Sequence, residues 1–234
     1  VAGMMRLWRT PELRFLGVAV TIVVIYVLAW VPGKVYYTDG MLPVVLAAGA
    51  VPAGEWLTRA RHHVRRRWLV VAGAALGVVI TVLATLPVVP LASLHETSAS
   101  TTVTDTVGWP QLTADVAAQD RALTRAGAPP AAIYTGAYAE AGALDTYGGH
   151  DRLPPVISAH NTFWMWGPGN ASDRTVLVVD ALTQLRPYFA SCRALTVFNP
   201  PAQVKSDWNG ITIGVCTGPS APWRTLWPHL KHYD

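Results

Sequence analysis

Three long apolar runs fill most of the first ninety residues, at about 15–32, 41–57 and 68–91. A stretch of about 20 apolar residues is long enough to cross the hydrocarbon core of a bilayer as a helix. The second run contains prolines and glycines, which membrane helices tolerate where neighbouring helices satisfy the freed backbone groups. The pattern therefore predicts three transmembrane helices in a membrane domain over residues 1–91.

The pattern changes after residue 91. Residues 92–108 are polar, rich in Ser and Thr and without periodicity, which indicates a connector. Residues 109–234 instead alternate between helical stripes and short apolar runs rich in β-branched residues. Helices are expected at 109–126, 138–147, 181–190 and 223–232, and strands at 131–135, 155–158, 175–180, 194–199 and 211–216.

This alternation favours an α/β domain over residues 109–234, with a mainly parallel sheet that is covered on both faces. No helix separates the last two strands, so we expect them to form an antiparallel edge. The predicted fold class is therefore a membrane α-helical segment, with three transmembrane helices, followed by an external α/β domain.

The distribution of basic residues predicts the orientation of the chain. Arg59, Arg61 and the run 65–67 directly precede the third apolar run, and arginines flanking a transmembrane helix are retained on the cytoplasmic side. The third helix then runs outward, which leaves the N-terminus cytoplasmic and residues 92–234 extracytoplasmic. We expect a multi-pass protein of the cell membrane.

The formal net charge of +4 does not indicate a nucleic-acid partner. Half of the Lys and Arg residues lie in the membrane domain, mostly on its inner flank, where they determine topology. This distribution argues against a protein that binds nucleic acid through a basic face.

Cys192 and Cys216 are the only two cysteines, and both fall in the part expected outside the cell. Because that compartment is oxidising, an even pair favours a disulfide, and two buried thiols are the alternative. No His residue or second cysteine pair lies nearby at the spacing of a zinc site. We therefore predict a disulfide and no cofactor, and a divalent metal ion is not indicated.

Two loops of the α/β domain, 136–142 and 158–168, hold the densest group of candidate site residues. Each loop follows the carboxyl end of a short strand, where open α/β sheets bind ligands. Glu140 and His160 could form an acid/base pair, or could bind a sugar with tryptophan as the stacking platform. Alternatively, Glu140 caps its helix and bonds His160 or Asn161. The candidate acceptor or sugar site consists of Tyr138, Glu140, His160, Asn161, Trp164 and Trp166.

A second candidate site lies in the short external loop between the first two apolar runs. Lys34 precedes Tyr36 and Tyr37, so an ammonium group and two phenols could hold a lipid phosphate. The alternative is an aromatic belt with a snorkelling lysine. Asp39 could serve as a base, with a solvated turn residue as the simpler interpretation.

Several stretches resemble the C-terminal third of bacterial membrane glycosyltransferases of the GT-C type. These are the family-39, mannosyltransferase-like proteins, which include the lipid A aminoarabinose transferases. The resemblance covers nearly the whole chain and is carried by GKVYY, GWPQL, GAYAEAGAL, SAHNTFWMWGP and GPSAPWRTLWPHLKHY. It implies sugar transfer from a polyprenyl-phosphate donor to an acceptor at the outer face, with Lys34, Tyr36 and Tyr37 near the donor phosphate. Cys192 and Cys216 match cysteines of that terminal domain.

The chain departs from this family in two respects. The family's catalytic carboxylate lies in an early external loop that has no counterpart here, and Thr38-Asp39-Gly40 replaces an apolar-Pro pattern. We therefore expect the C-terminal portion of such an enzyme without its catalytic N-terminal half. Its expected partners are membrane lipid, a polyprenyl-phosphate sugar and a polytopic membrane protein that supplies the missing helices. The alternative function is a membrane-anchored glycan-binding or accessory module without catalysis.

Overall fold

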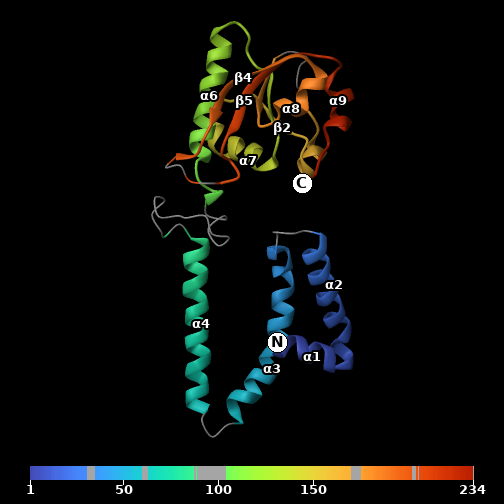
Figure 1. The fold of residues 1–234 in the computed structure, drawn as a ribbon, viewed down its shortest axis with the longest axis vertical. Helices are drawn as coiled ribbons and strands as arrows, with labels where there is room; N and C mark the ends of the chain where they lie inside the picture. Colours follow the sequence, from blue (N-terminus) through green and yellow to red (C-terminus); the bar gives the residue numbers. More distant parts are fainter. Residues whose placement is uncertain are drawn as a thin grey trace. The chain divides into compact units, whose positions relative to one another are not determined.

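The computed structural model describes residues 1–30, 35–59, 63–86, 88, 104–169, 175–201, 204 and 206–233 (Figure 1). Its internal contacts divide the chain into two units, Val1–Val79 and Ile80–Asp234. The boundary falls within the third apolar helix. The first unit thus contains most of the predicted membrane domain, and the second contains the whole predicted α/β domain.

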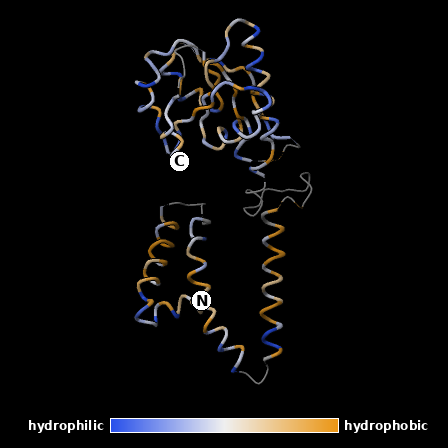
Figure 2. The backbone as a smooth tube through the Cα atoms, turned by 180° about the vertical axis from the view of Figure 1, so that it is seen from behind, coloured by the Kyte–Doolittle hydropathy of each residue, from blue (hydrophilic) through white to orange (hydrophobic). Residues whose placement is uncertain are grey.

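Three helices are long and apolar enough to span a membrane: α2 (Arg14–Trp30), α3 (Leu42–Thr58) and α4 (His63–Thr85). Little of their apolar surface is buried by the rest of the protein, and Figure 2 shows hydrophobic residues along most of each helix. Such exposed apolar surface is stable in lipid but costly in water. The structure therefore supports membrane association, and it confirms the predicted helices at 15–32 and 41–57.

The third predicted helix, 68–91, is displaced toward the C-terminus relative to α4, which begins at His63 and ends at Thr85. Arginine is a good helix former, so the basic run extends the helix at its start. The Arg66 side chain donates a hydrogen bond to the Trp56 carbonyl at 2.6 Å and lies over the Trp56 ring. At the other end, Pro87 in the sequence disfavours a helical conformation at the residue before it. Residues 87 and 89–91 lie outside the described residues.

A short helix at the start of the chain, α1 (Ala2–Arg9), was not predicted, and a 3-10 turn, η1 (Pro11–Leu13), joins it to α2. Leu7 is buried, and the Arg6 side chain donates to the Ala48 carbonyl of α3 at 3.3 Å. Gly3 packs so tightly against the backbone of α3 that a Cβ atom there would overlap the Val45 carbonyl. Eight residues give only about two turns, so an apolar period is hard to recognise in this segment.

The second unit is built on a five-stranded sheet with the order β2-β1-β3-β5-β4. β1 is parallel to β2 and β3, whereas β5 is antiparallel to both β3 and β4. The α/β class and the antiparallel edge are confirmed, but the sheet is mixed rather than mainly parallel. The strands are β1 (Ala132–Thr135), β2 (Val156–Ser158), β3 (Val176–Val179), β4 (Phe189–Phe198) and β5 (Ile211–Pro219).

Helices cover both faces of this sheet, as predicted (Figure 1). On one face, α6 (Trp109–Arg125) and α7 (Tyr138–Tyr147) contribute the buried side chains Leu112, Val116 and Leu144. On the other face, α8 (Leu182–Leu185) and α9 (Trp223–Leu230) contribute Leu185, Trp223 and Leu226. The remaining 3-10 turns are η2 (Val35–Met41), η4 (Gly148–His150), η5 (Asn161–Trp166) and η6 (Arg186–Tyr188).

The predicted helix over 181–190 is too long. The α-helix ends at Leu185, the turn η6 follows, and β4 already begins at Phe189. Pro187 explains the break because proline lacks the N–H group that a continuing α-helix would require. Most of the predicted connector, 92–108, lies outside the described residues.

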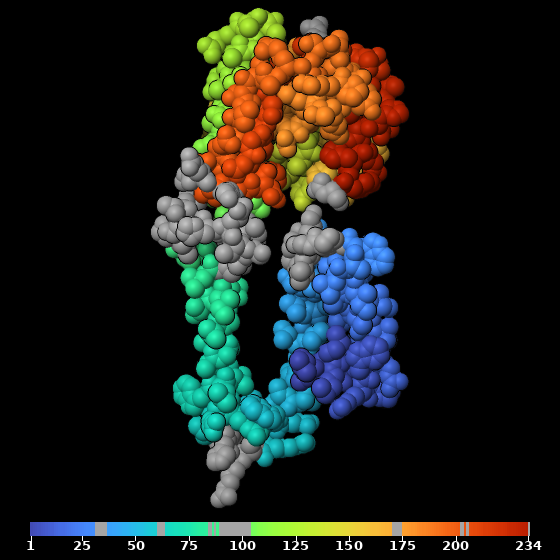
Figure 3. Space-filling view, viewed as in Figure 1, coloured from blue at the N-terminus to red at the C-terminus, as the bar shows by residue number. Residues whose placement is uncertain are grey.

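The predicted disulfide between Cys192 and Cys216 is confirmed. The predicted strand 194–199 begins after Cys192, but β4 already begins at Phe189, so the two cysteines face each other within the β4–β5 ladder. Orange to red-orange atoms of these two strands lie at the molecular surface in Figure 3. The bond thus joins the edge strand covalently to its neighbour.

Candidate functional site

The carboxyl ends of β1, β2 and β3 bring three loops to one edge of the sheet. The chain leaves β1 through α7 toward β2, whereas β3 lies on the other side of β1. Such a reversal of strand order opens the crevice in which α/β sheets bind ligands. At this point a Cβ atom on Gly136 would lie 2.6 Å from the Asp180 carbonyl oxygen, so glycine permits the two loops to approach.

Glu140 is fully buried at the start of α7. Its Oε2 accepts the Ala137 N–H at 3.0 Å, whereas Oε1 has no hydrogen-bond partner among the described residues. Burial, with a smaller contribution from Asp180, raises the pKa of Glu140 to about 8. This bond agrees with the alternative interpretation, in which Glu140 caps its helix, and burial favours the protonated form of the carboxyl group.

His160 is almost completely buried and is fixed by its neighbours. Its Nδ1 accepts the Tyr138 N–H at 3.1 Å, so in the neutral ring the proton resides on Nε2. Nε2 lies 2.9 Å from the Asn161 amide, whose oxygen must then face the ring. The Tyr138 ring packs against His160 at a centroid distance of 5.0 Å and is 50% exposed. Tyr138, His160 and Asn161 thus come together as predicted, whereas the Glu140 carboxyl group bonds the backbone of its own helix start.

The two predicted tryptophans have different environments. Trp164 donates its indole N–H to the Trp227 carbonyl at 3.0 Å, and Trp227 donates back to the Trp164 carbonyl at 2.9 Å. The Lys231 ammonium also covers the Trp164 ring at 4.2 Å. Trp166 is 75% exposed and packs only against Phe163 among the described aromatic rings. Trp166 therefore offers an accessible aromatic face, whereas Trp164 connects the turn η5 to α9 through these two hydrogen bonds.

The segment after α9, residues 231–233, ties the three loops together. Through its backbone, His232 donates to the Ala159 carbonyl at 3.3 Å and accepts the Asn161 N–H at 3.0 Å. Its Nε2 donates to the Gly136 carbonyl at 2.8 Å, and its ring stacks on His160 at 4.9 Å. Its Nδ1 lies within 3.0 Å of the Gln184 amide, which follows β3. We call this segment the C-terminal strap.

Replacing His232 by Ala should loosen the site without unfolding the domain. The substitution removes two side-chain hydrogen bonds and a ring contact, worth about 1–3 kcal/mol together. Amide hydrogen exchange should accelerate at Asn161, whose N–H donates to the strap. It should also accelerate at Tyr138, whose N–H donates to the His160 ring that stacks on His232. His229→Ala is the matched control because His229 is exposed and lies three residues away. Unchanged exchange in the His232 variant would contradict the role of the strap.

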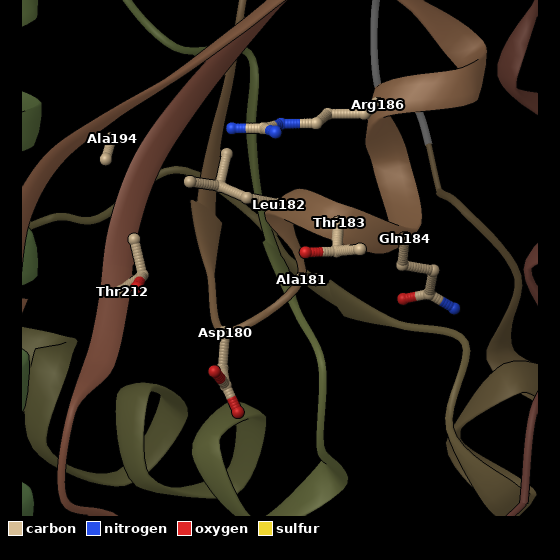
Figure 4. A pocket seen from close by; sticks show the side chains of 8 residues that line it. All are labelled: Asp180, Ala181, Leu182, Thr183, Gln184, Arg186, Ala194 and Thr212. Carbon is tan, nitrogen blue, oxygen red and sulfur yellow. The ribbon is translucent and has the colours of Figure 1, made fainter.

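A pocket of about 640 Å³ lies beside this edge, between α8 and the β4–β5 pair (Figure 4). This pocket was not predicted from the sequence. An acidic residue directly after a β-branched run, as in TVLVVD, is the signal that could have drawn attention to Asp180. The side chains that line the pocket belong to Asp180, Ala181, Leu182, Thr183, Gln184, Arg186, Ala194 and Thr212.

The predicted donor-phosphate site is only partly described. Lys34 lies outside the described residues, and the Tyr36 side chain is not described. Tyr37 lies in η2, and its ring is about half exposed. Asp39, in the same turn, is also exposed. The phosphate-binding role of Lys34, Tyr36 and Tyr37 therefore stays a prediction.

The edge as a whole offers groups that suit a polar organic ligand. Carboxyl, hydroxyl and guanidinium groups line the pocket, and Tyr138 and Trp166 add accessible aromatic rings. Among the described residues, no group of three or more His, Cys, Asp or Glu side chains could hold a metal ion. Comparison of the chain with known protein families, with curated proteins and with solved structures finds no match.

Proposed function

We propose that this chain acts in glycosyl transfer at a membrane surface, as the C-terminal portion of a polyprenyl-phosphate-sugar-dependent glycosyltransferase. In this proposal the α/β domain holds the sugar of the acceptor on the extracytoplasmic side. The observation that carries the proposal is the convergence of Tyr138, His160, Asn161 and Asp180 at the carboxyl edge of the sheet. The apolar helices suit a reaction whose donor is dissolved in the bilayer.

Two of these residues, Tyr138 and Asp180, offer groups that can contact a sugar ring directly. The C–H face of a sugar packs on an aromatic ring, and the half-exposed ring of Tyr138 offers such a surface. Hydroxyl groups donate to carboxylates, and such charge-assisted hydrogen bonds are stronger than neutral ones. The imidazole of His160 contacts Tyr138 and Asn161, so its role in this proposal is to position the two loops.

The transfer itself is a displacement at the anomeric carbon. An acceptor hydroxyl attacks that carbon and gives its proton to a carboxylate base, while the bond to the lipid phosphate oxygen breaks. A cation stabilises the departing phosphate. In this proposal Lys34, with Tyr36 and Tyr37, binds the phosphate. The carboxylate base belongs to a polytopic membrane partner that supplies further helices.

Sugar binding to the full chain in lipid nanodiscs tests the acceptor role. We expect neutral methyl glycosides to give saturation-transfer signals, and Tyr138→Ala to weaken binding about tenfold, which corresponds to about 1.4 kcal/mol. Tyr147→Ala is the matched control, since Tyr147 is 46% exposed at the other end of α7. The proposal fails if no glycoside binds, or if both variants bind like the wild type.

A glycan-binding module without catalysis is the second candidate. It is favoured by the exposure of Trp166 and its neighbour Met165, because an aromatic platform alone suffices for binding. Turnover with the complementing partner separates the two functions. Transfer should require Lys34 in the first case, so that Lys34→Ala abolishes most activity. Glycan binding with turnover that is unaffected by this substitution would favour the module.

A further inference from the structure

The pocket beside the carboxyl edge contains two charged groups, those of Asp180 and Arg186. Among the described residues, neither the Asp180 carboxylate nor the Arg186 guanidinium forms an ion pair. In Figure 4 the Asp180 carboxylate points away from Arg186, so the two charges occupy separate parts of the pocket. Unpaired charges that share a concave surface are available to a ligand.

The backbone holds Asp180 in an uncommon conformation. Its φ is +53°, in the left-handed region, where Asn and Asp are the most frequent non-glycine residues. The Asp180 N–H donates to the Thr212 carbonyl at 2.9 Å, and Gly136 lies against its carbonyl. Conformations of this kind are retained at ligand sites when the surroundings enforce them. The carboxylate is therefore held at the rim of the crevice between β1 and β3.

The Gln184 side chain, which also lines the pocket, is held in place by hydrogen bonds. Its amide oxygen accepts from Tyr134 at 3.0 Å, and its amide nitrogen donates to the Leu230 carbonyl at 2.9 Å. The groups left for a ligand are the carboxylate, the guanidinium and the hydroxyls of Thr183 and Thr212. They combine donors with acceptors, and their net charge is zero.

We infer that this pocket binds a neutral sugar ring, whose hydroxyls donate to Asp180 and accept from Arg186 and Thr183. The opposite charges of Asp180 and Arg186 offset each other across the pocket, so the pocket as a whole attracts neither an anion nor a cation, whereas sugar hydroxyls can bond to both groups. A volume of about 640 Å³ lies within the usual range for small-molecule sites. The inference rests on the proposed function, and it adds that the acceptor sugar is uncharged.

Glycoside titration of the full chain in nanodiscs tests the pocket. The probes are the neutral methyl glycosides of glucose, mannose, galactose and arabinose, with methyl glucuronide and methyl glucosaminide as charged counterparts. We expect at least one neutral glycoside to bind at least tenfold more tightly than either charged one. Asp180→Asn should weaken that binding at least tenfold, and Arg186→Gln and Thr183→Ala each severalfold. Asn tolerates the left-handed conformation, so the fold is retained.

Matched controls separate failure of the pocket from failure of the proposed function. Asp145→Asn and Arg193→Gln change exposed charges of the same domain outside the pocket and should bind like the wild type. If Tyr138→Ala weakens binding but Asp180→Asn does not, the pocket is overturned and the carbohydrate function stands. If a charged glycoside binds as tightly as the neutral ones, the assignment to a neutral sugar is wrong. Absence of binding by every probe overturns both.

Discussion

Glu140→Gln should make the α/β domain more stable than the wild type at pH 8, and the difference should shrink to about 1 kcal/mol or less by pH 5. The wild-type carboxyl group has a pKa of about 8 in the folded protein, against an ordinary value of 4.5. Between these values the unfolded chain has lost the proton and the folded chain retains it. Folding is therefore most favourable below pH 4.5 and weakens as the pH rises toward 8.

The magnitude follows from proton linkage, at about 1.4 kcal/mol for each pH unit within this window. Relaxation of the protein around the charged carboxylate reduces this effect. We therefore expect the free energy of unfolding of the wild type to fall by several kcal/mol by pH 8. Glutamine cannot ionise, and its amide oxygen can still accept the Ala137 N–H. Thermal unfolding between pH 5 and pH 9 measures the difference. Asp145→Asn, on the exposed side of the same helix, is the control. Parallel wild-type and Glu140→Gln curves would show that the buried proton is absent.

Removing the Cys192–Cys216 bond should lower the stability of the domain by about 3 kcal/mol. The two cysteines are 24 residues apart in the sequence, and cross-linking them restricts the unfolded chain. The bond also secures β4, an edge strand with much exposed surface. We expect the unfolding temperature of the variant with Cys192→Ala and Cys216→Ala to fall by roughly 10 °C.

Reduction provides the control for this prediction. Dithiothreitol should lower the unfolding temperature of the wild-type protein by a similar amount and leave the double variant unchanged. Equal unfolding temperatures for the oxidised wild type and the double variant would refute the stabilising role. A drop in the variant that dithiothreitol fails to reproduce would indicate a packing defect at Cys216, which is completely buried.

Elements with a strong local signal were predictable from the sequence. The apolar runs identify α2 and α3, and the β-branched run before Asp180 identifies β3. Proline and arginine shift the boundaries: Pro187 ends α8 early, and the basic run before Trp68 joins α4. These errors arise where a local residue preference competes with the apolar pattern.

The contacts of the site were less predictable because they join distant segments. The sequence places Glu140 and His160 after neighbouring strands, but it does not reveal that His160 stacks on His232, 72 positions later. Trp164 and Trp166 are equivalent as a pattern, yet one packs against α9 and the other is exposed. The pocket at Asp180 depends on the pairing of β5 with β3, which follows from tertiary structure alone.

We propose that the α/β domain lies outside the cell, where it would meet a lipid-borne substrate. Single cysteines introduced at exposed positions of the full chain, Ala118→Cys in α6 and Thr58→Cys at the end of α3, test it directly. The native cysteines are bonded to each other and do not interfere. A membrane-impermeant maleimide should label position 118 in intact cells and position 58 only after permeabilisation. Labelling of position 58 in intact cells, with position 118 protected until lysis, would contradict the account.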